Sequence, residues 1–157
     1  MYFVSPTYGK LSRRALKQHI SLFMKLDQSA QYRLIIGVDS QRNATHTFDF
    51  VTAVIIQRLG KGGIYFWKRE VLQKKIGLKE RMYTEAIMSL QSAEDIIKLF
   101  KGNGIAKYDI EIHVDIGNNG KTKDLISEIV GMVRSSGYTV KIKPDAFGAS
   151  NVADRHV

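Results

Sequence analysis

The chain has 157 residues, with 24 Lys and Arg against 15 Asp and Glu, which gives a formal net charge of +9. The hydrophobic fraction of 44% and the charged fraction of 25% are ordinary for one globular domain and exclude disordered and fibrous classes. No cysteine is present, which excludes a disulfide scaffold, thiolate zinc and a cysteine nucleophile. The basic excess favours a polyanion as partner, nucleic acid ahead of a membrane surface, although it could serve solubility alone. No apolar run reaches the roughly 20 residues of a membrane span, so we expect a cytosolic protein.

Residues 1–30 are expected to form an N-terminal helical extension that packs on the core, and residues 31–157 to form a single domain. Ser12 suits the N-cap of a helix that ends near Leu26, because its hydroxyl can accept a hydrogen bond from the first turn. Three strands rich in β-branched and aromatic residues follow, over residues 31–39, 48–57 and 64–69. The short connections between them make these strands antiparallel.

Helical periodicity replaces the strand pattern over residues 78–100, which predicts one long helix. A fourth strand, residues 108–115, alternates between apolar and polar side chains. A helix ended by Gly137, a fifth strand over residues 138–143 and a short C-terminal helix complete the chain. Strands joined through helices are parallel with right-handed crossovers. The prediction is therefore an α/β fold: a mixed five-stranded sheet flanked by helices, with strands one to three antiparallel and strands one, four and five parallel.

Two aspartates stand where parallel strands are predicted to end, Asp39 after the first strand and Asp115 after the fourth. Ligands collect at the carboxyl ends of parallel strands in open sheets. If the two strands are neighbours, their carboxylates lie about 5 Å apart, which is unfavourable unless a cation or a shared proton lies between them. Each aspartate alone would be interpreted as a solvated turn residue, so the interpretation depends on the whole set of acids.

Further acids extend this set. Glu85 lies three residues after Met82 and four before Ser89, at the edge of the helical stripe that packs on the sheet, and a charge there needs a partner. A salt bridge to Arg or Lys is the competing interpretation. For a fourth acid there are two candidates, because Asp145 follows the fifth strand directly and Asp154 belongs to the final helix. Spacing alone does not separate them.

The order of these acids resembles that of the ribonuclease H superfamily, with Asp on the first strand, Glu on the first core helix, Asp after the fourth strand and Asp near the last helix. Three segments are similar to the bacterial YkuK-type family of predicted RNase H-like nucleases. They are Gly37-Val38-Asp39-Ser40-Gln41, the run from His113 to Thr122, and the run from Lys143-Pro144-Asp145 to Ala153-Asp154-Arg155. The likeness covers nearly the whole chain.

The resemblance implies a nuclease, and it assigns the metal-ligand and catalytic roles to Asp39, Glu85 and Asp115, with Asp154 or Asp145 as the fourth acid. Carboxylates select hard Mg²⁺ or Mn²⁺, and two such ions about 4 Å apart can activate water for phosphodiester hydrolysis. Basic residues near the predicted site are candidates for holding the phosphates of RNA or DNA: Lys121, Lys123, Lys143 and Arg155. Classical ribonuclease H has Asp-Gly where this chain has Asp39 and Ser40, so specificity for RNA–DNA hybrids is not implied.

Two other functions share parts of this pattern. An actin-like nucleotide-binding protein also carries Asp-x-Gly after a strand, as in Asp115-Ile116-Gly117, but such proteins close two large domains on the nucleotide. A module of ribonuclease H-like fold that binds nucleic acid without cutting it is the other alternative. Tyr65, Phe66 and Trp67 could stack on bases in such a module, although core positions in a third strand are the simpler interpretation. The sequence leaves the substrate and the oligomeric state open.

Overall fold

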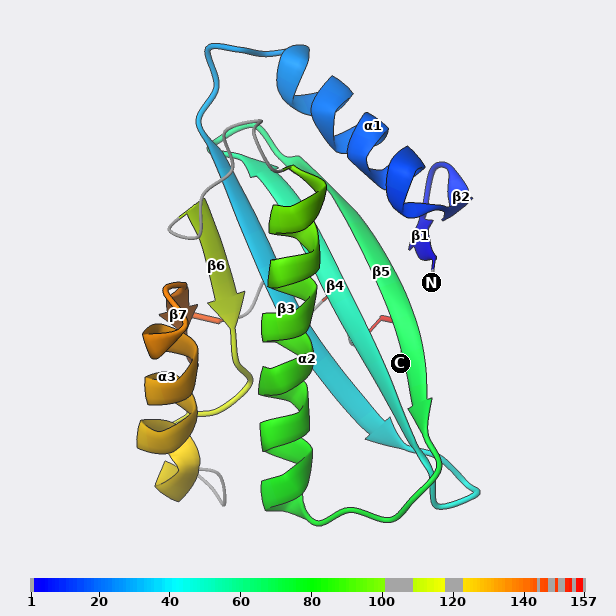
Figure 1. The fold of residues 1–157 in the computed structure, drawn as a ribbon, viewed down its shortest axis with the longest axis vertical. Coiled ribbons are helices and arrows are strands. Elements are labelled where there is room, and N and C mark those ends of the chain that lie inside the picture. The colour runs from blue at the N-terminus through cyan, green and yellow to red at the C-terminus, as the bar shows by residue number, and fades with distance from the viewer. Residues whose placement is uncertain are drawn as a thin grey trace.

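Strand β3 (Tyr32–Arg42) is an interior strand that joins the antiparallel and the parallel parts of the sheet (Figure 1). It pairs along its whole length with antiparallel β4 (Phe48–Arg58), which in turn pairs with antiparallel β5 (Gly63–Leu72). On its other side β3 pairs with parallel β6 (Ile110–His113), and β6 pairs with parallel β7 (Thr139–Lys141). The computed structural model describes residues 2–100, 109–117, 123–143, 145–146, 149, 152–153 and 155–156.

Seven strands, not five, make up the sheet of the described residues, in the order β2-β1-β5-β4-β3-β6-β7. The five predicted strands have the predicted directions, but their number was wrong because residues 3–11 also form strands. β1 (Phe3–Ser5) and β2 (Gly9–Leu11) make a hairpin, and Val4 of β1 pairs with Trp67 of β5. Phe3 and Leu11 are buried in the main core, so burial of apolar surface holds this hairpin on the sheet.

The sequence pattern predicted that the first strand ends at Asp39, and this was wrong. β3 continues to Arg42, because its ladder with β4 runs on to the pair Arg42–Phe48. The parallel ladder with β6 is shorter, and its last described pair is Gly37–His113. Asp39 therefore lies inside an antiparallel hairpin but two residues beyond the parallel ladder, which places it where β6 leaves the sheet.

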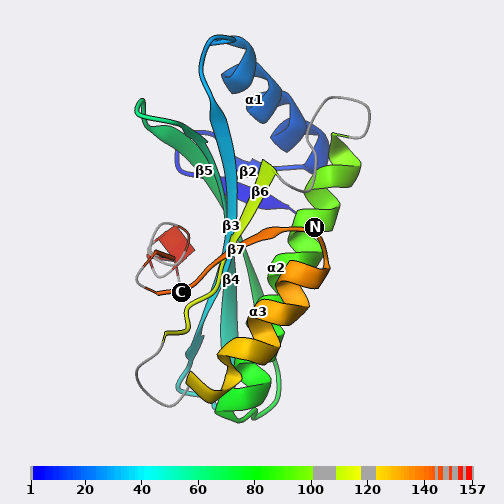
Figure 2. The ribbon, with the colours of Figure 1, turned by 90° about the vertical axis from the view of Figure 1, so that its left-hand side faces the viewer.

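Three helices cover one face of the sheet (Figure 2): α1 (Arg13–Lys25), α2 (Leu78–Leu99) and α3 (Ile126–Ser135). Ser12 caps α1 as predicted, and its hydroxyl accepts a hydrogen bond from the Ala15 N–H. A single 3-10 turn (Lys123–Leu125) precedes α3. Among the helices described, none has the length and apolar character needed to cross a membrane.

The opposite face is partly covered by the C-terminal segment, whose described residues Ala149, Val152 and Ala153 are helical (Figure 2). Ala153 packs against Val51 and Ala53 of β4, and all three are fully buried. Gly37 permits the close approach of this segment, because a Cβ on Gly37 would lie only 2.6 Å from the Ala149 Cβ. Small side chains on both sides thus set the distance between the C-terminal segment and the sheet.

Replacement of Gly37 by Ala should therefore lower the free energy of unfolding by about 1–3 kcal/mol, the usual cost of overpacking. Gly131→Ala is the matched control, because Gly131 lies in α3 with nothing within 4 Å of an added Cβ. Alanine there should raise stability by roughly 0.5–1 kcal/mol through helix propensity. Urea unfolding of the two variants measures both effects, and equal changes in both would contradict the close contact at Ala149.

Candidate functional site

Glu85 of α2 is buried against β3, with only 3% of its surface exposed. Its Oε1 accepts a hydrogen bond of 2.5 Å from the Ser40 hydroxyl. Arg81, one turn earlier on α2, donates from Nε to Ser40 Oγ at 2.7 Å and from Nη2 to the Ser40 carbonyl at 3.0 Å. The same Nε lies 3.5 Å from Glu85 Oε1. The prediction that Glu85 faces the sheet is confirmed, and a salt bridge accompanies it.

The carboxyl of Glu85 holds its proton more tightly than an ordinary glutamate. Burial raises its pKa to about 7, against the hydrogen bond from Ser40 and the charge of Arg81, which lower it. The negative charge of Asp39 raises it further. Near neutral pH this group therefore lies between its charged and neutral forms, and additional positive charge would favour the carboxylate.

Asp115 and Lys143 are brought together by the backbone beyond β6. The Val114 N–H donates to the Lys141 carbonyl, and the Lys143 N–H donates to the Ile116 carbonyl, both at 2.9 Å. These bonds continue the β6–β7 pairing past the ends of both strands. Lys143 Nζ then lies 2.8 Å from Asp115 Oδ1. The hydrogen bond to Asp115 and the charge of Asp115 raise the pKa of the Lys143 ammonium, and the charge of Asp39 adds to the rise.

Asp39 acts on both groups from the other face of β3. Side chains alternate along a strand, and Val38 packs beside Met88 while Ser40 binds Glu85, both on α2. Asp39 therefore points to the face that the C-terminal segment partly covers. Its charge raises the pKa of Glu85 on one side and that of Lys143 on the other. Electrostatically, Asp39 is the common neighbour of the two groups.

The other predicted site residues lie at separate exposed positions or outside the described residues. Asp145 is exposed in the turn after β7, where its N–H donates to the Ile142 carbonyl at 2.8 Å. Lys123 is exposed at the start of the 3-10 turn, and Arg155 is exposed near the C-terminus. Asp154 and Lys121 lie outside the described residues. Within the described part of the chain, no three His, Asp or Glu side chains are grouped so that they could hold a metal ion.

The sequence interpretation missed the side chains that position these acids. Ser40 directly follows Asp39, and Arg81 precedes Glu85 by four residues, a spacing that places both on one helical face and could have indicated the pair. A second polar group lies on the face of Asp39. Glu111 binds His113 Nε2 at 2.6 Å and Arg33 Nε at 3.3 Å, and both Glu111 and His113 are buried. The alternation of β6 had placed both on one face without indicating this contact.

The geometry agrees with comparisons to known proteins. The model of the family described as Ribonuclease H-like matches residues 15–157. The chain belongs to the ribonuclease H-like family. It is also similar to "Uncharacterized protein YkuK" of Bacillus subtilis (strain 168), with 32% identity over 165 aligned residues that cover 98% of this chain and 95% of the relative. The resemblance inferred from the sequence motifs is thereby confirmed.

The family match includes every element from within α1 onward and therefore all the candidate site residues. Membership in this family associates the chain with proteins that act on or bind nucleic acid. No solved structure matches the chain. The assignment of individual residues to roles must therefore come from their geometry and chemistry.

Replacement of Glu85 by Gln should stabilise the metal-free protein at neutral pH. Since the folded-state pKa of Glu85 is raised from 4.5 to about 7, the folded state binds the proton more tightly, and the free energy of unfolding falls as pH rises through this interval. Ionisation of Glu85 in the folded state therefore lowers the free energy of unfolding by at most about 3 kcal/mol. The free energy of unfolding of Glu85→Gln should thus be higher than that of the wild type by roughly 1–3 kcal/mol at pH 8 and equal to it near pH 4.5.

Urea unfolding in EDTA at several pH values measures this difference. Gln can still accept the Ser40 hydrogen bond, so the comparison isolates the charge. A Glu85→Gln protein that is less stable than the wild type at pH 8 would contradict the prediction and show that Arg81 compensates the buried charge.

Proposed function

We propose that the protein is a metal-dependent nuclease that hydrolyses phosphodiester bonds of RNA or DNA at Asp39, Glu85 and Asp115. One observation carries this proposal: Glu85 is hydrogen-bonded to Ser40, the residue after Asp39, and Asp115 is paired with Lys143 just beyond the end of the parallel ladder between β3 and β6. Acids from β3, α2 and the end of β6 thereby share one electrostatic environment. Acids on three neighbouring elements, in a basic chain of this family, favour a site for divalent cations and phosphates.

The donor set suits Mg²⁺ or Mn²⁺ in its chemistry, because all the candidate ligands are carboxylate oxygens. Burial raises the pKa of Glu85 to about 7 and the charge of Asp39 adds to the rise, so a bound cation would favour the carboxylate. Lys143 supplies part of the positive charge through its contact with Asp115. We infer that its ammonium takes the place of a cation, and that Asp115 exchanges it for the metal when metal binds.

In the proposed mechanism, Asp39, Glu85 and Asp115 would hold the metal, with Asp154 or Asp145 as a fourth ligand. In the described residues the side chains of Asp39, Glu85 and Asp115 do not form a group that could hold a metal ion, so they would have to reorient when metal binds. The chemistry that divalent cations would supply there, when bound, is activation of a water and stabilisation of the charge on the leaving oxygen. Arg81 holds Ser40 and Glu85 together and so fixes the orientation of that carboxylate. Lys143, once released from Asp115, is close enough to the site to hold a phosphate of the substrate. Lys121, Lys123 and Arg155 are proposed to bind the more distant phosphates.

The second candidate is a module that binds nucleic acid without cleaving it. The observation in its favour is that the acids have internal partners: Asp115 has Lys143, and Glu85 has Ser40 and Arg81. The lack of a three-ligand group among the described residues points the same way. The two candidates share the fold and the basic charge, and they differ only in whether metal enters and cleavage follows.

Incubation with labelled single-stranded, duplex, hybrid and branched substrates in Mn²⁺ tests the nuclease proposal. Asp39→Asn and Asp115→Asn should each reduce cleavage by on the order of a hundredfold or more, since even residues behind metal ligands contribute about 10–100-fold. Asp95→Asn is the matched control, because Asp95 is a partly exposed acid of α2 that pairs with Arg13 on the surface. Its cleavage rate should equal that of the wild type.

Two outcomes would separate the candidates. Cleavage that persists in Asp39→Asn would reject the site, even if the protein is a nuclease. Binding of the same substrates without cleavage in any divalent metal would favour the binding module. EDTA should abolish the cleavage by the wild type if the carboxylates act through metal.

Lys143→Gln should increase the stabilisation that Mn²⁺ gives to the protein. Without metal, the loss of this partly exposed ion pair should cost less than about 1 kcal/mol. With metal, Asp115 no longer has an ammonium to displace, so the dissociation constant for Mn²⁺ should fall several-fold and the increase in Tm should exceed that of the wild type. Calorimetric titration and thermal unfolding measure both, and weaker Mn²⁺ binding by Lys143→Gln would contradict the exchange.

A further inference from the structure

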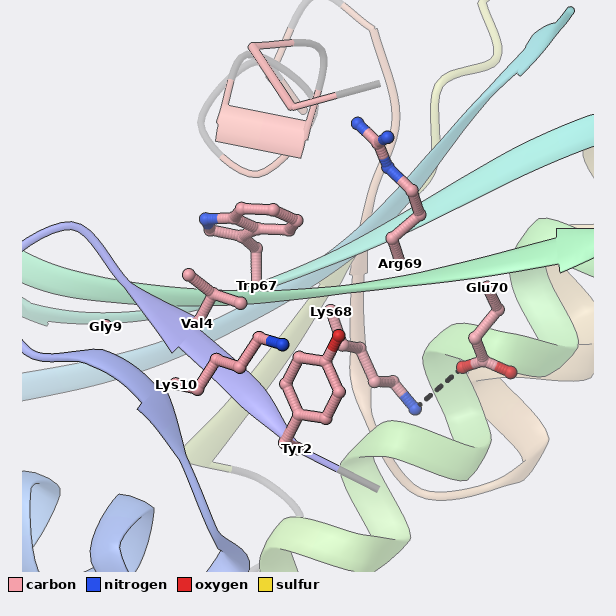
Figure 3. Close-up of a pocket in the computed structure, with 8 residues that line it drawn as sticks. All are labelled: Tyr2, Val4, Gly9, Lys10, Trp67, Lys68, Arg69 and Glu70. Atoms are coloured by element: carbon pink, nitrogen blue, oxygen red, sulfur yellow. Dashed lines mark ion pairs between the residues drawn. The ribbon is translucent and has the colours of Figure 1, made fainter.

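A pocket of about 540 Å³ lies at the edge of the sheet where β1 meets β5. Its lining comes from three strands and from the residue that precedes β1: Tyr2, Val4, Gly9, Lys10, Trp67, Lys68, Arg69 and Glu70 (Figure 3). Side chains alternate along β5, so Lys68 and Glu70 project to one side of the strand and Trp67 and Arg69 to the other. The pocket therefore reaches both sides of β5, and its volume lies within the usual range for small-molecule and nucleotide sites.

Cations dominate the polar groups of this pocket. Lys68 is buried, with 6% of its surface exposed, and its Nζ lies 3.0 Å from Glu70 Oε1. Lys10 is exposed, and its Nζ lies 4.7 Å from the centre of the Tyr2 ring. The Arg69 side chain is 43% exposed; its Nη1 lies 3.9 Å from Asp49 Oδ2 and its Nη2 donates to the His156 carbonyl, which leaves further guanidinium N–H groups for a ligand. With three cations against one acid in the lining, an anionic group is the favoured occupant.

Aromatic rings lie beside these cations. Tyr2 is 52% exposed, so its ring is accessible, and Figure 3 shows it beside the Lys10 ammonium. Trp67 lies on the other side of β5 and stacks on His156 with ring centres 4.3 Å apart. An exposed ring beside a flexible cation can stack on a nucleobase while the cation contacts its phosphate.

The pocket is also aligned with the candidate nuclease site. Arg69 pairs with Val51, and Val51 pairs with Asp39, so Arg69 and Asp39 occupy one row of the sheet. Two strand spacings separate their backbones, which is about 10 Å. Both side chains point to the face that the C-terminal segment partly covers. A strand of nucleic acid with one nucleotide in the pocket would therefore have its neighbouring phosphates within reach of Asp39.

We propose that this pocket binds an unpaired nucleotide of a single-stranded nucleic acid segment, with the base on Tyr2 and the phosphates at Lys10 and Arg69. Lys68, held by Glu70, forms the charged floor of the pocket. This inference rests on the proposed function in naming nucleic acid as the ligand. Beyond that function, the substrate has a single-stranded portion that binds in this pocket, away from the proposed nuclease site at Asp39, Glu85 and Asp115. The single-stranded portion, rather than a continuous duplex, is what the protein selects.

Fluorescence provides a direct test, because Trp67 is the only tryptophan of the chain and lines the pocket. The full chain carrying Asp39→Asn, in EDTA, is titrated with a short oligothymidylate, so that binding is measured without cleavage. We expect a saturable change in Trp67 emission. Tyr2→Ala should weaken binding about tenfold, within the range measured for loss of one base stack, whereas Tyr2→Phe should keep it within about twofold.

Charge variants separate a phosphate contact from general attraction. Lys10→Gln should weaken binding and reduce the dependence of log Kd on log salt by about one. Lys25→Gln removes the same charge from the exposed last turn of α1, and the α1 axis alone separates it from the β2 end by about 20 Å. This control should retain the affinity and the salt dependence of the parent. Tyr2 and Lys10 are exposed, so their replacement should leave the fold intact.

Equal affinity of Tyr2→Ala, Tyr2→Phe and the parent would overturn the inference. An equal change in Trp67 emission with polyglutamate would also overturn it, because the pocket would then respond to negative charge and not to a base. The proposed function fails separately. If the wild type cleaves and Tyr2→Ala has no effect on binding or cleavage, the pocket proposal is rejected and the nuclease proposal stands. If the pocket binds the oligonucleotide and no cleavage occurs, the nuclease proposal is rejected and the pocket proposal stands.

Discussion

The burial of the Glu85 carboxylate against Ser40 is the interaction on which the candidate site depends. It joins α2 to β3 at the level where β6 leaves the sheet, and Arg81 holds both partners. Burial of a carboxylate costs free energy of folding, and the charge of Asp39 adds to this cost. Both effects raise the pKa of Glu85. Stability alone would favour a neutral residue here. An acid that costs stability at such a position is typical of a site kept for binding.

The candidate site residues lie on both faces of β3. Glu85 reaches the strand from the helical face, whereas Asp39 lies on the opposite face, where Gly37 and Ala149 allow the C-terminal segment to approach closely. The backbone beyond β6 then brings Lys143 to Asp115. Charged groups thus lie on both faces of β3 beyond the end of the parallel ladder. The proposed metal chemistry and the compensating role of Lys143 follow from this single arrangement.

Much of the fold could be predicted from local pattern, because hydrophobic period and turn residues determine which segments become strands or helices. The inward position of Glu85 followed from its spacing to Met82, and the cap at Ser12 from residue type. The length of β3 could not be predicted, since it depends on a ladder with β4 that extends past Asp39. The Lys143–Asp115 contact likewise depends on backbone bonds between distant segments. The strands of residues 3–11 are too short to show a period of their own.

The N-terminal hairpin has a consequence for the behaviour of the protein at high concentration. Without it, the ten-residue β5 would be the outermost strand, and its free backbone groups would offer a template on which another molecule could add a strand. β2 takes that outer place with three residues, Gly9-Lys10-Leu11, of which the lysine is exposed and charged. So short and charged a border resists edge-to-edge aggregation. The hairpin pairs with β5 at Val4–Trp67, so it hinders strand addition at that part of the edge as well as enlarging the sheet.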